Sequence, residues 1–487
     1  MIRRLGIVLV LAAAVCGQSA ELAIVNADIR TMDPANPTAR SLAISGGRLI
    51  AVGSSAEVAR TITPETKVID AEGRLVLPGF NDSHVHFTAL GHVFSTIDLS
   101  GCSSAGEVLA KIRKYTAVLP KGRWILGSGW KAAALPVLRE LDAAAPENPV
   151  FVFGPGGETA LVNSLTTRKA GIDAALNNIA GRDLQKVRQI IPAEHMRDDV
   201  AAAEAASNYA ASLGITSIHD MDPTDKANMY RLLADSGRLK TRIYDCVDIR
   251  ARPKEARSTA HISMVRTGCV KAFFEGNEAA GEIQEMDRLI FEADREGFQI
   301  AVHAIGNRAN QAALAAFSKL SAQKHDRRFR IEHAHQALPI SLKRMTTAKL
   351  IASIQPLLFF AGKRHATGDY RYLLDGGAVL AMGSDASMAD MDPLKVVRAA
   401  VLGGKLTVQE SVAAYTFGSA YAEFQENEKG MLKVGMLGDE VILSDNIFAM
   451  PPEKIGDAVV EWTIVNGKPV YQRKSSNEVF APRPFVP

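Results

Sequence analysis

Short apolar runs separated by turn residues occupy both ends of the chain. Near the start they lie at residues 22–25, 41–44, 48–52 and 67–70, with Ser45-Gly46-Gly47 as turn chemistry between two of them. Near the end, runs at 440–444 and 462–465 precede Asn466-Gly467, a strong β-hairpin signal. The pattern predicts one small β-sandwich domain built from both chain ends, residues 21–77 and 428–475.

The middle of the chain alternates helical and strand patterns. Helical periodicity covers 197–213 and 286–296, and after each helix a glycine precedes a short apolar strand, at 215–219 and 299–303. Further strands are expected at 269–274, 329–333, 350–354 and 379–383. Such alternation is typical of βαβ units around a parallel sheet. We therefore predict an α/β fold, a (β/α)8 TIM-type barrel over 78–427 with an insertion at about 105–195 after the first barrel strand.

The first 20 residues differ from the rest of the chain. Arg3-Arg4 precede an apolar run, and small or polar residues follow it, which predicts a signal peptide over residues 1–20. We therefore expect an exported protein, periplasmic or secreted. Cys16 follows the apolar run and keeps lipid anchoring as an alternative. Beyond residue 20 no apolar run reaches the roughly 18 residues of a membrane span.

Composition narrows the function classes. The 487 residues are 47% hydrophobic and 22% charged, which is ordinary for a globular protein large enough for a barrel and an accessory domain. The 56 Lys+Arg against 53 Asp+Glu form no basic cluster, so we expect a small-molecule substrate and no nucleic-acid partner. The oligomeric state stays open, a homo-oligomer included. Without Cys16, three cysteines remain and none has CxxC spacing, which favours buried thiols over a disulfide framework.

The strongest local signal for chemistry is the pair His84 and His86, which follows the apolar run 75–80. In a strand, residues i and i+2 point to one face, so both imidazoles can bind one metal while Val85 turns away. Imidazole is a common zinc ligand. If this pair is considered alone, two solvated histidines that bind no metal are the alternative interpretation.

Four more metal-compatible side chains stand at the ends of predicted strands. The intervals from Lys271 to His303 and from His303 to His333 each match one βα repeat of roughly 30 residues, and Asp385 closes the strand at 379–383. Any one of these side chains could be a paired structural group. Because a barrel gathers the carboxyl ends of its strands at one face, the series predicts a shared metal site.

These residues resemble a known family. Residues 77–86, 214–220, 303–306, 330–334, 383–385 and 438–443 are similar to the amidohydrolase superfamily, and more narrowly to its YtcJ-like branch, amidohydrolase family 3. The resemblance covers roughly residues 21–475.

The resemblance implies a role for each predicted ligand. His84 and His86 would bind the more buried metal, and His303 and His333 the second. Lys271, carboxylated by carbon dioxide on its amine, would bridge the two ions, since a carbamate supplies two oxygens. Asp385 would bind metal and act as the catalytic general base. Zinc is the favoured divalent ion, and whether one or two ions bind stays open.

The chain also departs from the family pattern. Glu158 stands where a substrate-side histidine is expected, and Glu275 lies in the altered segment after the lysine. We treat these two carboxylates as candidate substrate-binding residues, under the hypothesis of a basic or larger polar substrate.

The function predicted from the sequence is hydrolysis of a non-peptide C–N bond, in an N-acyl, N-formyl or cyclic amide, by metal-activated water. Deamination or ester or lactone hydrolysis at the same site is one alternative. An exported binding protein without catalysis is the other. The sequence does not identify the substrate or the exact signal cleavage site.

Overall fold

The computed structural model describes residues 19–94, 97–99, 101–117, 119, 121–130, 135–154, 158–173, 175–192, 196–253, 263–320, 326–360 and 370–473. The predicted signal peptide, with Cys16, lies almost entirely outside the described residues. None of the described helices is long and apolar enough to cross a membrane.

Eight parallel strands form the central sheet, in the order β20-β19-β18-β17-β16-β15-β14-β8. The first and last strands nearly close it, because the Asp385 N–H donates to the His84 carbonyl at 2.8 Å and Val85 bridges Ala386. The sheet is therefore a nearly closed barrel, which confirms the predicted fold class. Its strands are β8 (Phe80–Val85), β14 (Ile215–Asp220), β15 (Arg242–Asp248), β16 (Val265–Phe274), β17 (Gln299–Ile305), β18 (Arg330–His335), β19 (Ile351–Ile354) and β20 (Val379–Met382).

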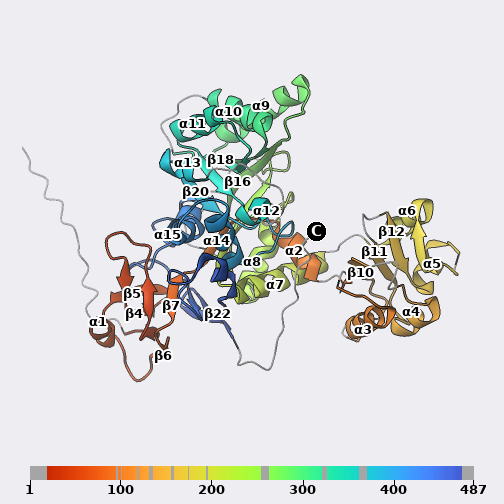
Figure 1. Ribbon diagram of the computed structural model, residues 1–487, viewed down its shortest axis with the longest axis horizontal. Coiled ribbons are helices and arrows are strands. Elements are labelled where there is room, and N and C mark those ends of the chain that lie inside the picture. The colour runs from red at the N-terminus through yellow and green to blue at the C-terminus, as the bar shows by residue number, and fades with distance from the viewer. Residues whose placement is uncertain are drawn as a thin grey trace, which may run out of the picture.

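Helices follow most barrel strands and cover the outside of the sheet (Figure 1). In α9 the buried residues Met286, Leu289, Ile290 and Ala293 recur at helical spacing, so one stripe packs against the strands. The helices of this part are α2 (Phe87–Phe94), α7 (Met196–Ser212), α8 (Ala227–Asp235), α9 (Ala280–Arg295), α10 (Asn307–Ser318), α11 (Pro339–Thr347), α12 (Pro356–Phe360), α13 (Tyr370–Asp375), α14 (Pro393–Leu402), α15 (Val408–Ala413), the π-helix η3 (Ala414–Gly418) and α16 (Ser419–Ala422).

Two smaller sheets pack face to face and unite the chain ends. Their common core contains Leu22 and Ile44 from the start of the chain together with Ile442 and Ile464 from its end. One sheet has the order β5-β4-β1-β6 and the other β23-β22-β21-β7-β2-β3. Their elements are β1 (Leu22–Val25), β2 (Asp28–Arg30), β3 (Thr38–Ala39), β4 (Ser41–Ser45), β5 (Arg48–Gly53), α1 (Ser55–Ala59), β6 (Lys67–Asp70), β7 (Leu75–Pro78), β21 (Glu440–Leu443), η4 (Pro452–Asp457), β22 (Val460–Val465) and β23 (Lys468–Gln472).

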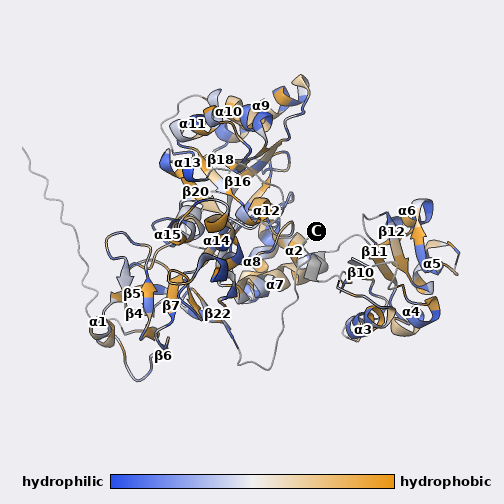
Figure 2. Cartoon of the chain, viewed as in Figure 1, coloured by the Kyte–Doolittle hydropathy of each residue, from blue (hydrophilic) through white to orange (hydrophobic). Residues whose placement is uncertain are grey.

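A five-stranded sheet stands apart from the barrel, between α2 and α7 in sequence (Figure 1). Its helices α3 and α4 carry both hydrophilic and hydrophobic residues, as amphipathic helices on a sheet do (Figure 2). This is the insertion expected after the first barrel strand. Its elements are β9 (Ile97–Asp98), α3 (Ala105–Thr116), β10 (Ile125–Ser128), α4 (Leu138–Ala144), β11 (Val150–Phe153), β12 (Thr159–Val162), α5 (Ser164–Ala170), β13 (Asn178–Ala180) and α6 (Gly181–Ile190).

One interpretation of the sequence is wrong. Cys246 and Cys269 are joined by a disulfide, whereas the cysteines were expected to be buried thiols; Cys102 is buried and is not part of this disulfide. The odd number of cysteines and the lack of CxxC spacing do not reveal whether two cysteines lie opposite each other on neighbouring strands. Cys246 lies in β15, a strand that the sequence analysis did not predict, and it is register-paired with Cys269 in β16.

Candidate metal centre

The predicted ligands meet at the carboxyl ends of the barrel strands. His84 lies in β8, and His86 follows it directly before α2. Lys271 lies in β16, His303 in β17 and His333 in β18. Asp385 follows β20.

Three of these residues form the centre of the cluster. One ligand atom from each of His84, His86 and Asp385 lies within 4.8 Å of the others. Asp385 Oδ1 is 3.6 Å from Nε2 of both histidines. It is buried and has no hydrogen-bond partner among the described residues. A divalent cation would satisfy this orphaned carboxylate oxygen, so the three side chains fit a metal site.

The other three predicted ligands contact this centre in turn. Lys271 Nζ is 3.3 Å from His84 Nε2. The His333 ring lies 5.0 Å from the His84 ring and 4.6 Å from the His303 ring, measured between centroids. His333 Nδ1 is buried and also lacks a partner within the described part of the chain. All six predicted ligands thus form one connected cluster.

Burial sets the charge state of the cluster. It lowers the pKa of His84 and His333 well below the usual histidine value, aided by the nearby Lys271 or by neighbouring histidines. It lowers the pKa of His303 to about 4 and that of Lys271 to about 8. It also raises the pKa of Asp385 to about 6. The imidazoles of His84, His303 and His333 are therefore neutral at neutral pH, which is the form that binds metal.

His84 and Asp385 are placed by a close approach between the backbone of β8 and the segment that follows β20. Asp82, buried in β8, accepts from the N–H of His84 and of Ser384, at 3.1 and 3.0 Å. A Cβ at Gly383 would lie 2.6 Å from Asp82 Oδ1, so only glycine fits there. Asp385 itself has a φ of 59°, a conformation that non-glycine residues rarely adopt and that is common at functional sites.

Two carboxylates that the sequence analysis did not single out contact the outer nitrogens of the paired histidines. Glu332 Oε2 is 2.7 Å from His84 Nδ1, and Asp222 Oδ1 is 3.7 Å from His86 Nδ1. Histidines that bind metal commonly meet a carboxylate on the opposite ring nitrogen, which fixes the tautomer and the ring orientation. In the sequence, Glu332 directly precedes His333 and Asp222 follows a predicted strand, the only signals available for either.

The two candidate substrate-binding carboxylates lie in different places. Glu275 follows β16, and its Oε1 is 3.8 Å from His303 Nε2 at the edge of the cluster. Glu158 is exposed and directly precedes β12 in the insertion sheet, which stands apart from the barrel (Figure 1). The structure therefore brings Glu275 to the cluster and does not bring Glu158 there.

His335 lies in β18, two residues beyond His333. Its ring stacks on Phe359, with centroids 3.7 Å apart. Both of its ring nitrogens are buried without a partner within the described ranges.

Comparisons with known proteins agree with the fold and identify the family. The model of the Amidohydrolase family matches residues 67–471. The chain is 29% identical to Protein LONG AFTER FAR-RED 3 of Arabidopsis thaliana, over 93% of this chain and 92% of that protein. It is 24% identical to an N-substituted formamide deformylase of Arthrobacter pascens, over 94% and 100% of the two chains.

The chain is also 25% identical to the putative amidohydrolase YtcJ of Bacillus subtilis, over 84% of this chain and 92% of that one, which confirms the branch expected from the motifs. A solved structure of an uncharacterised metal-dependent hydrolase from Pyrococcus furiosus has the same fold. Its TM-score is 0.70 at 24% identity, with 88% of this chain and 99% of that chain covered. Since the family match covers most of the sequence and the barrel presents a histidine and aspartate cluster at its carboxyl face, the chain belongs to the Amidohydrolase family.

Proposed function

We propose that this protein is a metal-dependent hydrolase that cleaves the C–N bond of an N-acyl, N-formyl or cyclic amide. The observation that carries the proposal is the convergence of His84, His86 and Asp385, with ligand atoms within 4.8 Å of one another. Relatives named N-substituted formamide deformylase and imidazolonepropionase support this substrate class.

His84, His86 and Asp385 would hold a divalent metal, for which zinc is our first choice because two imidazoles and a carboxylate suit it. When bound, such an ion polarises a carbonyl oxygen and lowers the pKa of water to ~7. Asp385 Oδ1, which has no hydrogen-bond partner among the described residues, would take the proton from the attacking water and deliver it to the leaving nitrogen. Glu332 and Asp222 would keep the two imidazoles in orientation.

Lys271 would bridge two ions if its amine carries a carboxyl group. The amine is buried and lies 3.3 Å from His84 Nε2, so an added carboxyl group would enter the cluster. The neutral amine attacks carbon dioxide and releases a proton, which leaves a carbamate with two oxygens for metal. His303 and His333 would hold the second ion.

The test is the metal content of the purified protein, measured by elemental mass spectrometry for wild type, Lys271→Ala and the surface control Lys319→Ala. We expect about two equivalents in wild type and in the control, and fewer in Lys271→Ala. One equivalent that is indifferent to Lys271 would exclude the bridge. No metal after expression with zinc and bicarbonate would overturn the proposal and favour the binding-protein alternative.

A metal-loaded protein then needs a substrate screen. We expect carboxylate release from N-formyl and N-acyl amines or from cyclic amides. Ammonia release from amino-substituted rings without carboxylate release would instead identify a deaminase, and preferential opening of esters or lactones an esterase or lactonase.

We also propose that the protein is exported to the periplasm or secreted. Two features support this: the basic and apolar pattern of residues 1–20, and the disulfide, since disulfides persist in oxidising compartments. The first residue of the protein recovered from cells decides the question. A start near residue 21 supports export, a lipid on Cys16 supports the anchored form, and an intact Met1 in the cytoplasm contradicts both.

A further inference from the structure

The disulfide lies inside the barrel rather than at its surface. Cys246 in β15 and Cys269 in β16 are register partners on neighbouring parallel strands, with Cα atoms 4.4 Å apart. Both side chains are fully buried, at 0% and 1% exposure. They pack with Met221, Tyr244 and Ala301 in a small cluster of their own.

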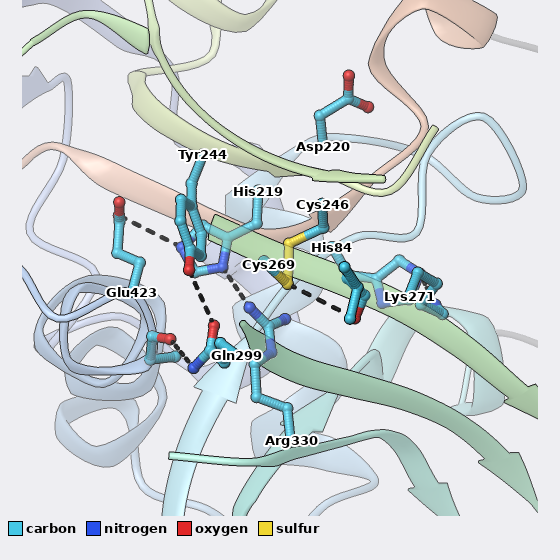
Figure 3. The surroundings of a disulfide bond; sticks show 12 residues. His84, His219, Asp220, Tyr244, Cys246, Cys269, Lys271, Gln299, Arg330 and Glu423 are labelled. Atoms are coloured by element: carbon cyan, nitrogen blue, oxygen red, sulfur yellow. Dashed lines mark hydrogen bonds and ion pairs between the residues drawn. A yellow bond between two sulfur atoms is a disulfide. The ribbon is translucent and has the colours of Figure 1, made fainter. Parts of the chain in front are cut away.

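This position is directly next to the metal cluster. Cys269 precedes Lys271 by two residues in β16, so both side chains point to the same face of the strand. Figure 3 shows the disulfide between Lys271 and His84 on one side and the Tyr244, His219 and Gln299 group on the other. The disulfide is therefore part of the layer of side chains on which the metal cluster rests.

At this point β16 is paired on both sides, Lys271 with Asp248 of β15 and with Ala301 of β17. Lys271 Nζ meets His84 Nε2, whereas the pairing of β15 with β16 shifts register between Asp245 and Cys246. A register shift interrupts the backbone hydrogen bonds between β15 and β16, so these bonds alone fix the position of β16 less firmly. The covalent link stands at the first register pair after that irregularity.

We propose that the Cys246–Cys269 disulfide is a cross-link that positions Lys271 against His84, so that full metal occupancy requires the oxidised protein. The proposal makes the two cysteines positioning residues. Its metal clause rests on the proposed function, whereas the existence of the cross-link does not.

Formation of the cross-link is a thiol–disulfide exchange. One cysteine thiolate attacks a small disulfide such as oxidised glutathione and releases one glutathione thiol; the second cysteine then displaces the other glutathione. Two protein thiols are oxidised, one glutathione disulfide is reduced to two thiols, and the protons of the protein thiols end on glutathione. Because both cysteines are buried inside the nearly closed barrel, the exchange occurs during folding, and reductants reach the bond only after the barrel opens.

The first test maps the thiols of the full chain by differential alkylation and peptide mass spectrometry. In denaturant without reductant, we expect Cys102 to be alkylated and Cys246 and Cys269 to be protected; reductant in denaturant should expose both. Under native conditions, the same reductant should leave both protected. Alkylation of Cys246 and Cys269 in the unreduced protein would overturn the proposal whatever its metal content.

The second test measures the zinc affinity of the double variant Cys246→Ala/Cys269→Ala against wild type, with Cys102→Ala as the matched control for loss of a buried cysteine. We expect the dissociation constant of the double variant to rise about tenfold, as for the loss of other groups that orient metal ligands. The control should be unchanged. A purely structural cross-link would lower only the melting temperature, and unchanged affinity in the double variant would overturn the positioning role.

If the double variant does not fold, a measurement on wild type replaces it. Wild type is unfolded, refolded with or without reductant, and then alkylated and assayed for zinc. Low occupancy confined to the reduced sample supports the proposal, and equal occupancy overturns it. If wild type never binds metal, the proposed function fails together with the metal clause, while the thiol map separately decides whether the cross-link exists.

Discussion

Asp222 and Glu332 show how single residues shape the candidate site without occupying it. Each faces the nitrogen of a histidine that points away from the cluster, at 3.7 Å and 2.7 Å. They differ in what else they hold. Glu332 also pairs with Arg330, which is wholly buried, so its replacement would leave an uncompensated charge in the core. Asp222 pairs outward with Lys226 and is the cleaner residue to test.

We predict that Asp222→Asn weakens metal binding by roughly tenfold, because loss of a carboxylate partner reduces ligand orientation and basicity. The protein should stay folded, since the amide can still accept the hydrogen bond from the Thr88 N–H. Asp225→Asn is the matched control, an exposed carboxylate three residues away. Titration with zinc measures the effect. Equal affinities for the two variants would show that Asp222 does not orient His86.

At the scale of elements, the chain after α16 closes the barrel at the end opposite the metal cluster. Glu423, the first residue after that helix, is buried and pairs with Lys429 at 2.7 Å, with Arg266 at 3.0 Å and with His219 at 3.3 Å. Since Arg266 lies in β16 and His219 in β14, one carboxylate ties the C-terminal segment to two barrel strands.

We predict that Glu423→Gln lowers the free energy of unfolding by about 3–5 kcal/mol, because it leaves the buried Lys429 and the partly buried Arg266 without their carboxylate partner. Glu285→Gln is the control, since Glu285 forms an exposed pair with Arg288 on α9 that should contribute about 0–1 kcal/mol. Urea unfolding measures both variants. A loss below 1 kcal/mol in Glu423→Gln would mean that the buried charges find other partners.

The same carboxylate predicts a pH dependence. Burial opposes its ionisation, but Lys429, His219 and Arg266 outweigh burial and hold the pKa of Glu423 below its usual value of 4.5. A group with a lowered folded-state pKa contributes stability above its unfolded pKa and loses that contribution as pH falls toward the folded pKa. The stability gap between wild type and Glu423→Gln should therefore be full at pH 7 and shrink below about pH 4.5. Urea midpoints across this range check the sign.

Sequence patterns predicted elements better than contacts between elements. The barrel strands at 215–219 and 299–303 were predicted because each is a short apolar run after a helix, with Gly214 or Gly297 between the helix and the strand. β15 was missed because Arg242, Asp245 and Asp248 interrupt its apolar pattern. The Asn81–Glu423 hydrogen bond joins residues far apart in sequence, and only closure of the barrel creates it. The disulfide escaped prediction because β15 was missed, and because Cys246 and Cys269 meet only when β15 pairs with β16.

At the scale of the whole molecule, the barrel and the insertion have separate hydrophobic cores. The two insertion cores contain residues of 97–191 alone, among them Ile125, Val150 and Leu184. The barrel core, which includes Phe80, Ile300 and Val397, contains none of them. The metal cluster draws its residues from the barrel strands and their carboxyl ends, so metal should stabilise the barrel and leave the insertion unaffected.

We therefore predict two unfolding transitions in calorimetry. Removal of metal with a chelator should lower the midpoint temperature of the barrel transition only. A ligand that binds the native state alone, at 100 times its dissociation constant, adds about 2.7 kcal/mol to the unit that holds it. The transition of the insertion serves as an internal control within the same scan. Adding zinc back should restore the shifted transition in wild type and should do so less fully in Lys271→Ala. A single transition that moves as a whole would show that the two units unfold together despite their separate cores.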